Sequence, residues 1–237
     1  MHITMIGHST IWIEAQGVNI LTDPYFGVWG NPAYKRVAPP ARSRAAFGDV
    51  NLVLVSHNHW DHVDRRFLHA LPDGVAVITP KHAQWMTWLS GAQHPVGLAA
   101  WEEKVCGLAT VTAVPAQHSA LAGGFVIQVE GQTLYFAGDT FYGAFMAEIA
   151  RRFSIDVALM PVTTYRIPMT MDEKTAVRAV TTLTPKVVIP IHLGIQPRSP
   201  LLRTNHTPEG FARRLREAGS QTKIVVLKEG ERWSTGQ

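Results

Sequence analysis

The chain has almost no cysteine, no long apolar run and little excess charge of either sign. Cys106 is the only cysteine among the 237 residues, so an intrachain disulfide is excluded. No stretch reaches the roughly 20 apolar residues of a transmembrane helix, and the N-terminus lacks the charged-then-apolar pattern of a secretory signal. The sequence therefore predicts a cytoplasmic protein without a membrane-spanning segment.

Length and composition favour one folded unit. Hydrophobic residues make up 46% of the chain, which is enough to bury a substantial core. No Pro/Gly/Ser linker, internal repeat or low-complexity tract divides it, so residues 1–237 are expected to form a single domain. The formal net charge of +4 is modest. No nucleic-acid partner is expected, and the sequence does not decide between a monomer and a homo-oligomer.

Basic residues cluster at four places in the chain. Two clusters, Arg151-Arg152 and 213–216, lie in expected helices, where a solvated outer face explains them. The other two, Lys35-Arg36 and Arg42-x-Arg44, lie in a long Pro-rich loop. There they could attract an anionic substrate, or they could simply be solvated.

Short apolar runs alternating with helical patterns predict a mixed α/β fold. Strands are expected at 3–6, 10–14, 18–22, 51–56, 75–78, 109–114, 124–129, 133–137, 156–160, 187–191 and 223–227. Helices are expected at 82–90, 144–153, 172–183 and 208–218. Thr170-x-x-Glu173 is typical of a capping box, and Thr207-Pro208 and Gly219 mark the two ends of the last helix. Strands at both chain ends with helices between them favour two sheets covered by helices.

The most informative stretch is His57-Asn58-His59-Trp60-Asp61-His62, which has four metal-binding side chains in six positions. It follows the expected strand at 51–56, so it lies on a loop at the strand's C-terminal end, where α/β sheets usually bind ligands. Residues two apart project to the same side of an extended loop. His57 and His59 can therefore share one ion, while Asp61 and His62, beyond the turn at Trp60, can hold a second.

Further candidate ligands follow three other expected strands, at His118, Asp139 and His192. His118 is expected to complete the first site, His192 the second, and Asp139 to bridge the two ions. The full set of expected ligands is His57, His59, Asp61, His62, His118, Asp139 and His192. All of them offer nitrogen or oxygen and none is cysteine, which is typical of a catalytic rather than a closed structural site.

Zinc is the expected metal for both positions, because imidazole and carboxylate ligands are typical of catalytic zinc. Manganese, iron, cobalt and nickel accept the same ligands and remain alternatives. Separate core or surface histidines would be the alternative to a metal centre. The agreement of four strand ends argues against that alternative.

These residues carry a family resemblance. The pattern His57-x-His59-x-Asp61-His62, followed by distant His, Asp and His, resembles the signature of metallo-β-lactamase-superfamily hydrolases. Other matching stretches are Gly7-His8-Ser9, Leu21-Thr22-Asp23-Pro24, Phe136-Ala137-Gly138-Asp139-Thr140, Ile191-His192-Leu193-Gly194 and Val226-Leu227-Lys228-Glu229-Gly230. The resemblance spans nearly the whole chain. It implies a four-layer αββα sandwich with a dinuclear site at one edge.

Within that superfamily, the chain resembles the branch of N-acylphosphatidylethanolamine-hydrolysing phospholipase D and L-ascorbate-6-phosphate lactonase-like proteins. One departure is the stretch Met169–Asp172, which lacks the histidine that the phospholipase has before its helix. The resemblance implies a hydrolase of a small-molecule or lipid-like substrate. A phosphodiester is the first expectation, and a lactone or another carboxylic ester or amide is the alternative. A nuclease and a non-catalytic metal-binding scaffold rank below both.

The expected mechanism uses a hydroxide held between the two ions as the nucleophile. Asp61 and Asp139 are the expected catalytic residues. Two other residues near strand ends have alternative interpretations. Asp23 is either an acceptor that orients a metal-binding histidine or a turn residue before Pro24. His8, in a Gly-His-Ser turn, either lines the pocket or is a hydrogen-bonded turn histidine.

Five further residues are candidates for contacting the substrate. Trp60 and Tyr142 adjoin expected ligands and are expected to form an apolar wall. Tyr165 and Arg166 follow the strand at 156–160 and are candidates to contact a leaving group, with ordinary loop packing as the alternative. His206 is either a substrate contact or a solvated loop residue.

Overall fold

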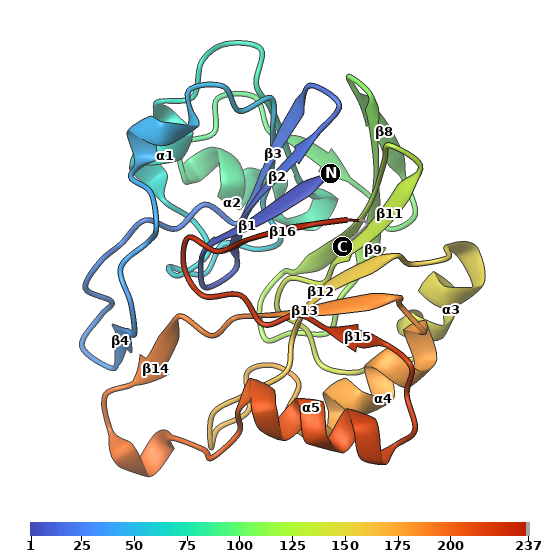
Figure 1. The fold of residues 1–237 in the computed structure, drawn as a ribbon. Helices are drawn as coiled ribbons and strands as arrows, with labels where there is room; N and C mark the ends of the chain where they lie inside the picture. Colours follow the sequence, from blue (N-terminus) through green and yellow to red (C-terminus); the bar gives the residue numbers. More distant parts are fainter. Residues whose placement is uncertain (236–237) are drawn as a thin grey trace.

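Two mixed β-sheets stacked face to face form the centre of the computed structural model, which describes residues 1–235 (Figure 1). The first sheet has the strand order β16-β1-β2-β3-β5-β6-β7, and the second has the order β15-β13-β12-β11-β10-β9-β8. Both sheets contain antiparallel and parallel pairs. A small two-stranded sheet, β14-β4, lies beside them.

The elements have the following bounds. The first sheet contains β1 (His2–Gly7), β2 (Thr10–Ala15), β3 (Val18–Thr22), β5 (Leu52–Leu54), β6 (Ala76–Pro80), β7 (Val96–Leu98) and β16 (Arg232–Ser234). The second contains β8 (Glu103–Cys106), β9 (Ala109–Pro115), β10 (Gly123–Val129), β11 (Gln132–Phe136), β12 (Val157–Pro161), β13 (Val187–Ile191) and β15 (Lys223–Ile224). The small sheet pairs β4 (Tyr34–Arg36) with β14 (Ile195–Pro197). The helices are α1 (Arg65–His69), α2 (Gln84–Leu89), α3 (Phe145–Arg152), α4 (Glu173–Leu183) and α5 (Pro208–Glu217), with short 3-10 turns η1 (Arg44–Phe47), η2 (Lys81–Ala83) and η3 (Pro200–Leu202).

Apolar side chains divide among three layers because successive strand residues point to opposite faces of a sheet. Between the sheets lie fully buried residues such as Ile13 and Phe125. The outer face of the second sheet packs against α3, α4 and α5, where Phe211 is fully buried. The outer face of the first sheet is covered by η1 and α1 through Phe47 and Phe67. This αββα arrangement confirms the expected fold class.

Each expected strand and helix has a counterpart in the structure, although several bounds differ. The strand expected at 51–56 is paired only at Leu52–Leu54, and the one expected at 223–227 only at Lys223–Ile224. The sequence patterns missed β4, β7, β8, β14, β16 and α1. These elements are three to five residues long, too short for a clear period, and the strands among them are held by pairing with a neighbour. Within residues 1–235, no helix combines the length and apolar character needed to cross a bilayer.

The start of α4 corrects the expected capping box. Asp172, rather than Thr170, is the N-cap: its carboxylate accepts a hydrogen bond from the Thr175 backbone N–H at 2.8 Å. The Asp172 N–H in turn donates to the Thr175 hydroxyl at 3.0 Å. Thr170 instead donates its hydroxyl proton to the carbonyl of Thr163. The motif lies two residues later than the sequence pattern indicated.

Glu173 is therefore free to connect α4 with α5. Its carboxylate accepts hydrogen bonds from the Thr207 backbone N–H at 2.8 Å and from the Arg214 side chain at 2.9 Å. Thr207 caps α5 as expected, because its hydroxyl accepts from the Gly210 N–H at 2.9 Å. Gly219, with φ of 73°, follows the helix end.

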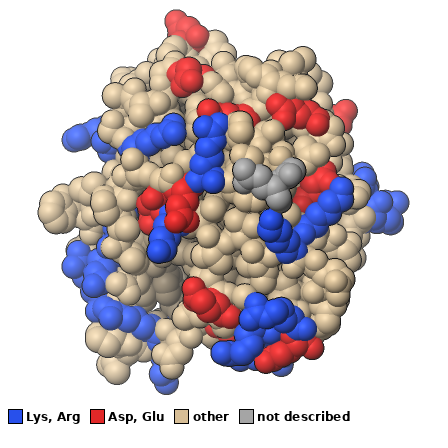
Figure 2. All heavy atoms as spheres, viewed as in Figure 1, with Lys and Arg blue, Asp and Glu red and all other residues tan. Residues whose placement is uncertain are grey.

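The basic clusters of α3 and α5 lie on the outer, solvent-exposed faces of these helices, as expected. Arg151 and Arg152 both bind Glu148 on the surface of α3. Figure 2 shows Lys/Arg and Asp/Glu atoms side by side over α5.

Gly210→Ala is expected to lower the free energy of unfolding by about 1–3 kcal/mol, because the added methyl group would overlap the Glu173 carboxylate. The loss of stability should be smaller when Glu173 is also replaced by alanine. Urea unfolding of the wild type, the two single variants and the double variant would measure the difference. Gly48→Ala is the matched control, since its added Cβ would meet no atom within 4 Å. An equal cost of Gly210→Ala in both backgrounds would contradict the overlap.

Candidate metal centre

The expected ligands gather at one edge of the sandwich, because each follows the end of a strand that reaches this edge. His57 follows β5, His118 follows β9, Asp139 follows β11 and His192 follows β13. Gly138, with φ of 56°, allows the turn that brings Asp139 to this edge.

Among the described residues, three groups of donor atoms could each hold a metal ion, since the atoms of each group lie within 4.8 Å of one another. The smallest, Asp23 with His57 and His62, shares both histidines with the other two groups, so two larger groups remain. The first group consists of His57, His59, His118 and Asp139, and the second of His8, Asp61, His62 and His192. The histidines of the first group and Asp61, His62 and His192 of the second are divided as expected from the sequence. His8 is an addition, and Asp139, expected to bridge the ions, is grouped here with the first site. The chain thus has two candidate metal sites side by side.

Asp139 lies between the two groups. Its Oδ2 is 3.1 Å from Nε2 of His192 in the second group and 3.8 Å from Nε2 of His118 in the first. Its Oδ1 is 3.4 Å from Nε2 of His62. One carboxylate therefore faces donors of both sites, which is the geometry that a bridging ligand requires.

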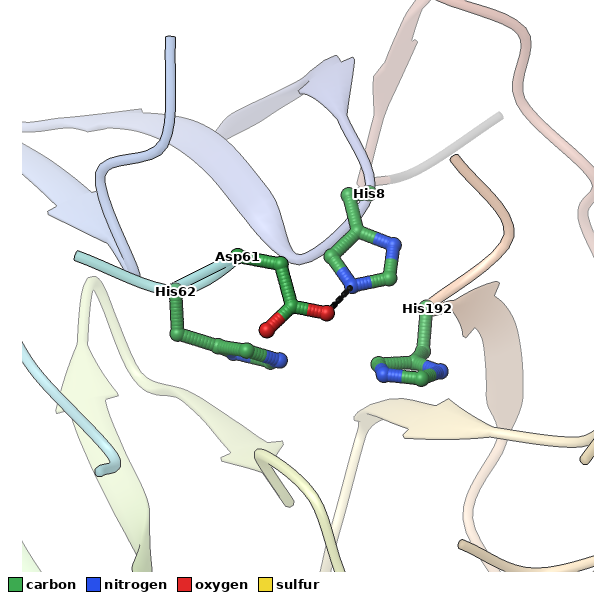
Figure 3. Close-up of side chains that lie close together, drawn as sticks. All are labelled: His8, Asp61, His62 and His192. Atoms are coloured by element: carbon green, nitrogen blue, oxygen red, sulfur yellow. Dashed lines mark ion pairs between the residues drawn. The ribbon is translucent and has the colours of Figure 1, made fainter. Parts of the chain in front are cut away.

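His8 belongs to the second group, a role that the sequence left undecided. Figure 3 shows His8, Asp61, His62 and His192 directed toward a common centre, with Nε2 of His8 at 3.4 Å from Oδ2 of Asp61. His8 is buried, with φ of 61°. The signal that could have identified it is its position after β1, since the other candidate ligands also follow strands.

The donor atoms fit a divalent cation. Among the described residues, Nε2 of His57, Nε2 of His62 and Oδ1 of Asp139 are buried without a hydrogen-bond partner, as are both ring nitrogens of His8. Buried polar atoms are ordinarily paired. A metal ion is a partner that would satisfy imidazole nitrogen and carboxylate oxygen together.

Hydrogen bonds to the second ring nitrogens orient the histidines. Nδ1 of His62 lies 2.7 Å from Oδ2 of Asp23, and Nδ1 of His118 lies 2.9 Å from the Met169 carbonyl. Nδ1 of His57 lies 3.0 Å from Oγ of Ser56. These bonds leave the Nε2 atoms to face the site, as is usual for metal-binding histidines.

Asp23 has the orienting geometry rather than only a turn role. Besides His62, it accepts hydrogen bonds from the Ser56 backbone N–H at 2.7 Å and from the Ser56 hydroxyl at 2.6 Å. The carboxylate is fully buried. One side chain therefore fixes both the strand end that carries the hexapeptide and the ring of His62.

Burial lowers the pKa values of the histidines in the first group. The pKa of His118 falls to about 4, and the pKa values of His57 and His59 are also lowered by burial and by the nearby His62. These histidines are therefore neutral at neutral pH. Neutral imidazole is the form that binds a metal ion.

His62 behaves in the opposite way. Burial alone would lower its pKa, but Asp139 and Asp23 together raise that pKa well above the usual value. Burial would likewise raise the pKa of Asp139, but His192 and His62 hold it well below its usual range. The field of the two carboxylates thus favours a cation, a proton or a metal ion, at Nε2 of His62.

An open cavity of about 160 Å³ reaches both groups. It is lined by Tyr34, His59, Trp60, Asp61, Asp139, Tyr165, Met169 and His192. Trp60 forms part of its wall, as expected. Tyr165 lines it too, but its hydroxyl donates to the Ile195 carbonyl at 3.0 Å, and burial raises its pKa, so it stays a neutral phenol. Tyr34 and Met169 were missed because nothing in their sequence pattern distinguishes them from other loop residues.

Three expected substrate contacts lie elsewhere. Tyr142 does not line the cavity: its ring packs on the core beneath α4, and its hydroxyl pairs with Thr182 at 3.1 Å. The Arg166 side chain is exposed and does not line the cavity either. His206 lines, together with Arg203, a neighbouring cavity of about 360 Å³ that shares Tyr165 and His192 with the metal cavity.

The basic loop residues also differ from the expectation. Arg36 is buried, and its guanidinium donates to the carbonyls of Tyr25, Gly27 and Ala38. Arg44 forms an ion pair with Asp64. These two residues hold loops in place, so only Lys35 and Arg42 remain available to attract an anion.

Purified protein is expected to bind about two divalent ions per chain, since two complete donor groups are present. Asp139→Ala should reduce this to about one or fewer and abolish hydrolysis, because Asp139 faces both sites. Elemental analysis after dialysis measures the stoichiometry, with His206→Ala as the control that keeps both ions. Equal metal content in the two variants would show that Asp139 does not join the sites.

Asp23→Asn is expected to weaken metal binding about 10- to 100-fold. The amide is uncharged and has only one oxygen, so it cannot accept the hydrogen bonds of both His62 and Ser56 as the carboxylate does. Competition with a chromophoric chelator measures the change. Asp73→Asn, at an exposed turn, is the matched control. If the folded Asp23→Asn protein bound the metal with unchanged affinity, Asp23 would have no orienting role toward His62 and would act only as a turn residue.

Comparison with known proteins agrees with this geometry. Residues 2–192 match the model of the β-lactamase superfamily domain. A UPF0173 metal-dependent hydrolase of Pyrococcus abyssi is 33% identical over 239 residues, covering 97% of each chain.

Solved structures agree as well. Igni18, a metallo hydrolase from Ignicoccus hospitalis, is 25% identical with a TM-score of 0.78, covering 98% of this chain and 97% of its own. The metallo-β-lactamase fold protein YhfI of Bacillus subtilis is 13% identical with a TM-score of 0.71, covering 98% of each chain, and shares the fold. The protein with these two buried His/Asp groups belongs to the UPF0173 family of metal-dependent hydrolases in the metallo-β-lactamase superfamily.

Proposed function

We propose that the protein hydrolyses a small, uncharged carbonyl substrate, such as a lactone, ester or amide, at a two-zinc centre. The observation that carries this proposal is the cavity that joins the two groups. Aromatic rings and Met169 surround its donor atoms, and no lysine or arginine is among its lining residues. A cavity of about 160 Å³ suits a compact substrate better than an extended one.

Bound divalent ions would supply an activated water and polarise the scissile group. The histidines of the first group would hold one ion and those of the second group the other, with zinc favoured by the imidazole and carboxylate donors. Asp61 and Asp139 are the carboxylates that face the cavity. Burial raises the pKa of each, but histidine neighbours hold it below its usual range, so both are ionised, which is the form that binds a metal ion.

The aromatic residues would position the substrate. The rings of Trp60 and Tyr25 pack edge to face, with their centroids 5.6 Å apart. The ring centroids of Tyr34 and Tyr165 are 5.4 Å apart, so these side chains restrict one another's movement. Such rigid apolar walls exclude water and bind the uncharged part of a substrate with little loss of side-chain entropy. This supports a neutral acyl compound.

A phosphodiester is the second candidate, in line with the similarity to the phospholipase D branch. The observation that favours it is the position of Asp139 between the two groups. Two ions joined by a shared carboxylate can stabilise the attacking and leaving oxygens of displacement at phosphorus. Lys35 and Arg42 would then help to attract the anion.

A substrate panel with metal-loaded protein distinguishes the two candidates. We expect kcat/KM for simple lactones and p-nitrophenyl acetate to exceed that for bis-p-nitrophenyl phosphate by at least about tenfold, a difference of about 1.4 kcal/mol in transition-state binding. The rate on the neutral substrates should change little with added salt. Asp139→Ala serves as the inactive control.

The opposite ranking would favour the phosphodiester. The phosphodiester rate should in that case fall with added salt, and Lys35→Gln with Arg42→Gln should flatten that dependence. Turnover of neither class by protein that contains both ions would overturn the proposal.

A further inference from the structure

Three segments beside the metal cavity, which contribute Tyr34 and Tyr165 to its wall, also form an outer surface that has no role in the proposed reaction. We call residues 27–37, 165–169 and 195–203 the projection. Figure 1 shows β4 and β14 of the projection extending to the lower left, away from the two large sheets.

Hydrogen bonds hold the three segments together. The Arg198 guanidinium donates to the carbonyls of Trp29 and Asn31, which joins 195–203 to 27–37. The Arg166 backbone N–H donates to the Leu202 carbonyl at 2.9 Å, which joins 165–169 to the same surface. The projection is therefore an ordered part of the fold, in which hydrogen bonds between the segments fix the positions of the side chains.

Large apolar side chains stand exposed on the projection. Trp29 is 82% exposed, Leu201 79% and Ile167 61%, and Val28 and Val37 are about half exposed. One exposed apolar residue needs no explanation, but several on one surface mark an interaction site. Each of the three segments contributes at least one of them.

The charge of the projection has one sign. Its segments contain no Asp or Glu, whereas Lys35, Arg166, Arg198 and Arg203 lie at least partly exposed on it. Within the described residues, none of these four cations forms an ion pair with a carboxylate. The acidic residues nearest to the three segments along the chain are Asp23 before 27–37, Asp172 after 165–169 and Glu209 after 195–203. Figure 2 shows Lys and Arg atoms along the lower left edge, where Figure 1 places β4 and β14.

We propose that the projection docks onto an anionic lipid bilayer. Exposed Trp, Ile and Leu insert into the boundary between headgroups and acyl chains, while neighbouring Lys and Arg bind the anionic headgroups. Trp29 is suited to this depth because its indole combines an apolar body with one N–H donor. Arg198 and Arg203 donate hydrogen bonds to backbone carbonyls, which leaves their positive charge without a neutralising carboxylate. Together with Lys35 and Arg166 they give the surface the charge complementarity that an anionic membrane requires.

Two other partners fit the projection less well. A symmetric contact with a second copy of the chain would place the four cations of one copy against those of the other, which is repulsive. A single-stranded nucleic acid would match the charge. However, Ile167 and Leu201 offer no aromatic face on which bases could stack.

Docking would place the metal cavity close to the lipid, because Tyr34 and Tyr165 belong both to the projection and to the cavity wall. Their rings lie 5.4 Å apart. The inference concerns binding alone and does not depend on which bond the metal centre hydrolyses.

Sedimentation with vesicles tests the proposal directly. We expect the intact protein to bind phosphatidylcholine vesicles that contain about a quarter phosphatidylglycerol, and to bind pure phosphatidylcholine at least about tenfold more weakly. Raising NaCl from about 50 mM to about 500 mM should weaken binding to the anionic vesicles, because the Debye length shortens.

Substitutions within the projection should reduce this binding without unfolding the protein. Trp29→Ser and Leu201→Ser, both at exposed positions, are each expected to weaken binding at least about fivefold through the lost apolar insertion. Arg166→Gln should weaken it severalfold and reduce its salt dependence. Trp88→Ser is the matched control, since this exposed tryptophan lies on α2, outside the projection.

Three results would overturn the proposal. One is the absence of binding to anionic vesicles by the folded protein. Another is binding that Trp88→Ser lowers as much as Trp29→Ser, which would place the contact elsewhere. The third is a dimer, measured by light scattering, that Leu201→Ser converts to a monomer in the absence of vesicle binding, which would make the projection an interface between copies.

Discussion

The organisation of this protein depends on one buried carboxylate placed among imidazole nitrogens. Asp139 faces donors from both groups, and several of those donors have no other partner within the described residues. Burying so many polar atoms is costly unless a cation satisfies them. The two sheets must therefore meet with their strand ends aligned, since a shift of either sheet would separate the two halves of the centre.

The backbone conformation at the strand ends also brings the metal-binding side chains together. His8, Asp23 and His192 all have positive φ values, which residues other than glycine rarely adopt. His192 donates its backbone N–H to the carbonyl of His8 at 3.0 Å, so the turns after β13 and β1 fix one another. Strain of this kind is found where function demands a defined geometry. Here it aims two imidazole rings at the second metal site.

The metal centre and the fold share their supporting contacts. Asp23 joins β3 to the end of β5 through Ser56 and also orients His62. The same side chain thus acts on strand packing and on metal geometry, so stability and metal affinity are coupled at this position. Part of the cavity wall is instead supplied from outside the two large sheets, by Tyr34 of β4 and by Tyr165.

The sequence patterns by themselves indicated two sheets covered by helices and placed the expected ligands at strand ends, because strand periodicity and the hexapeptide at 57–62 are local patterns. The four-layer order followed from the family resemblance. Only the tertiary structure decided which other side chains join the expected ligands. His8 and Tyr34 reach the centre through turns and through pairing of β4 with β14, which lies about 160 residues away in the chain. Tyr142, near an expected ligand in sequence, is partly buried and packs against the core beside α4 instead of lining the cavity. Proximity along the chain does not fix side-chain direction, since direction depends on packing against distant residues.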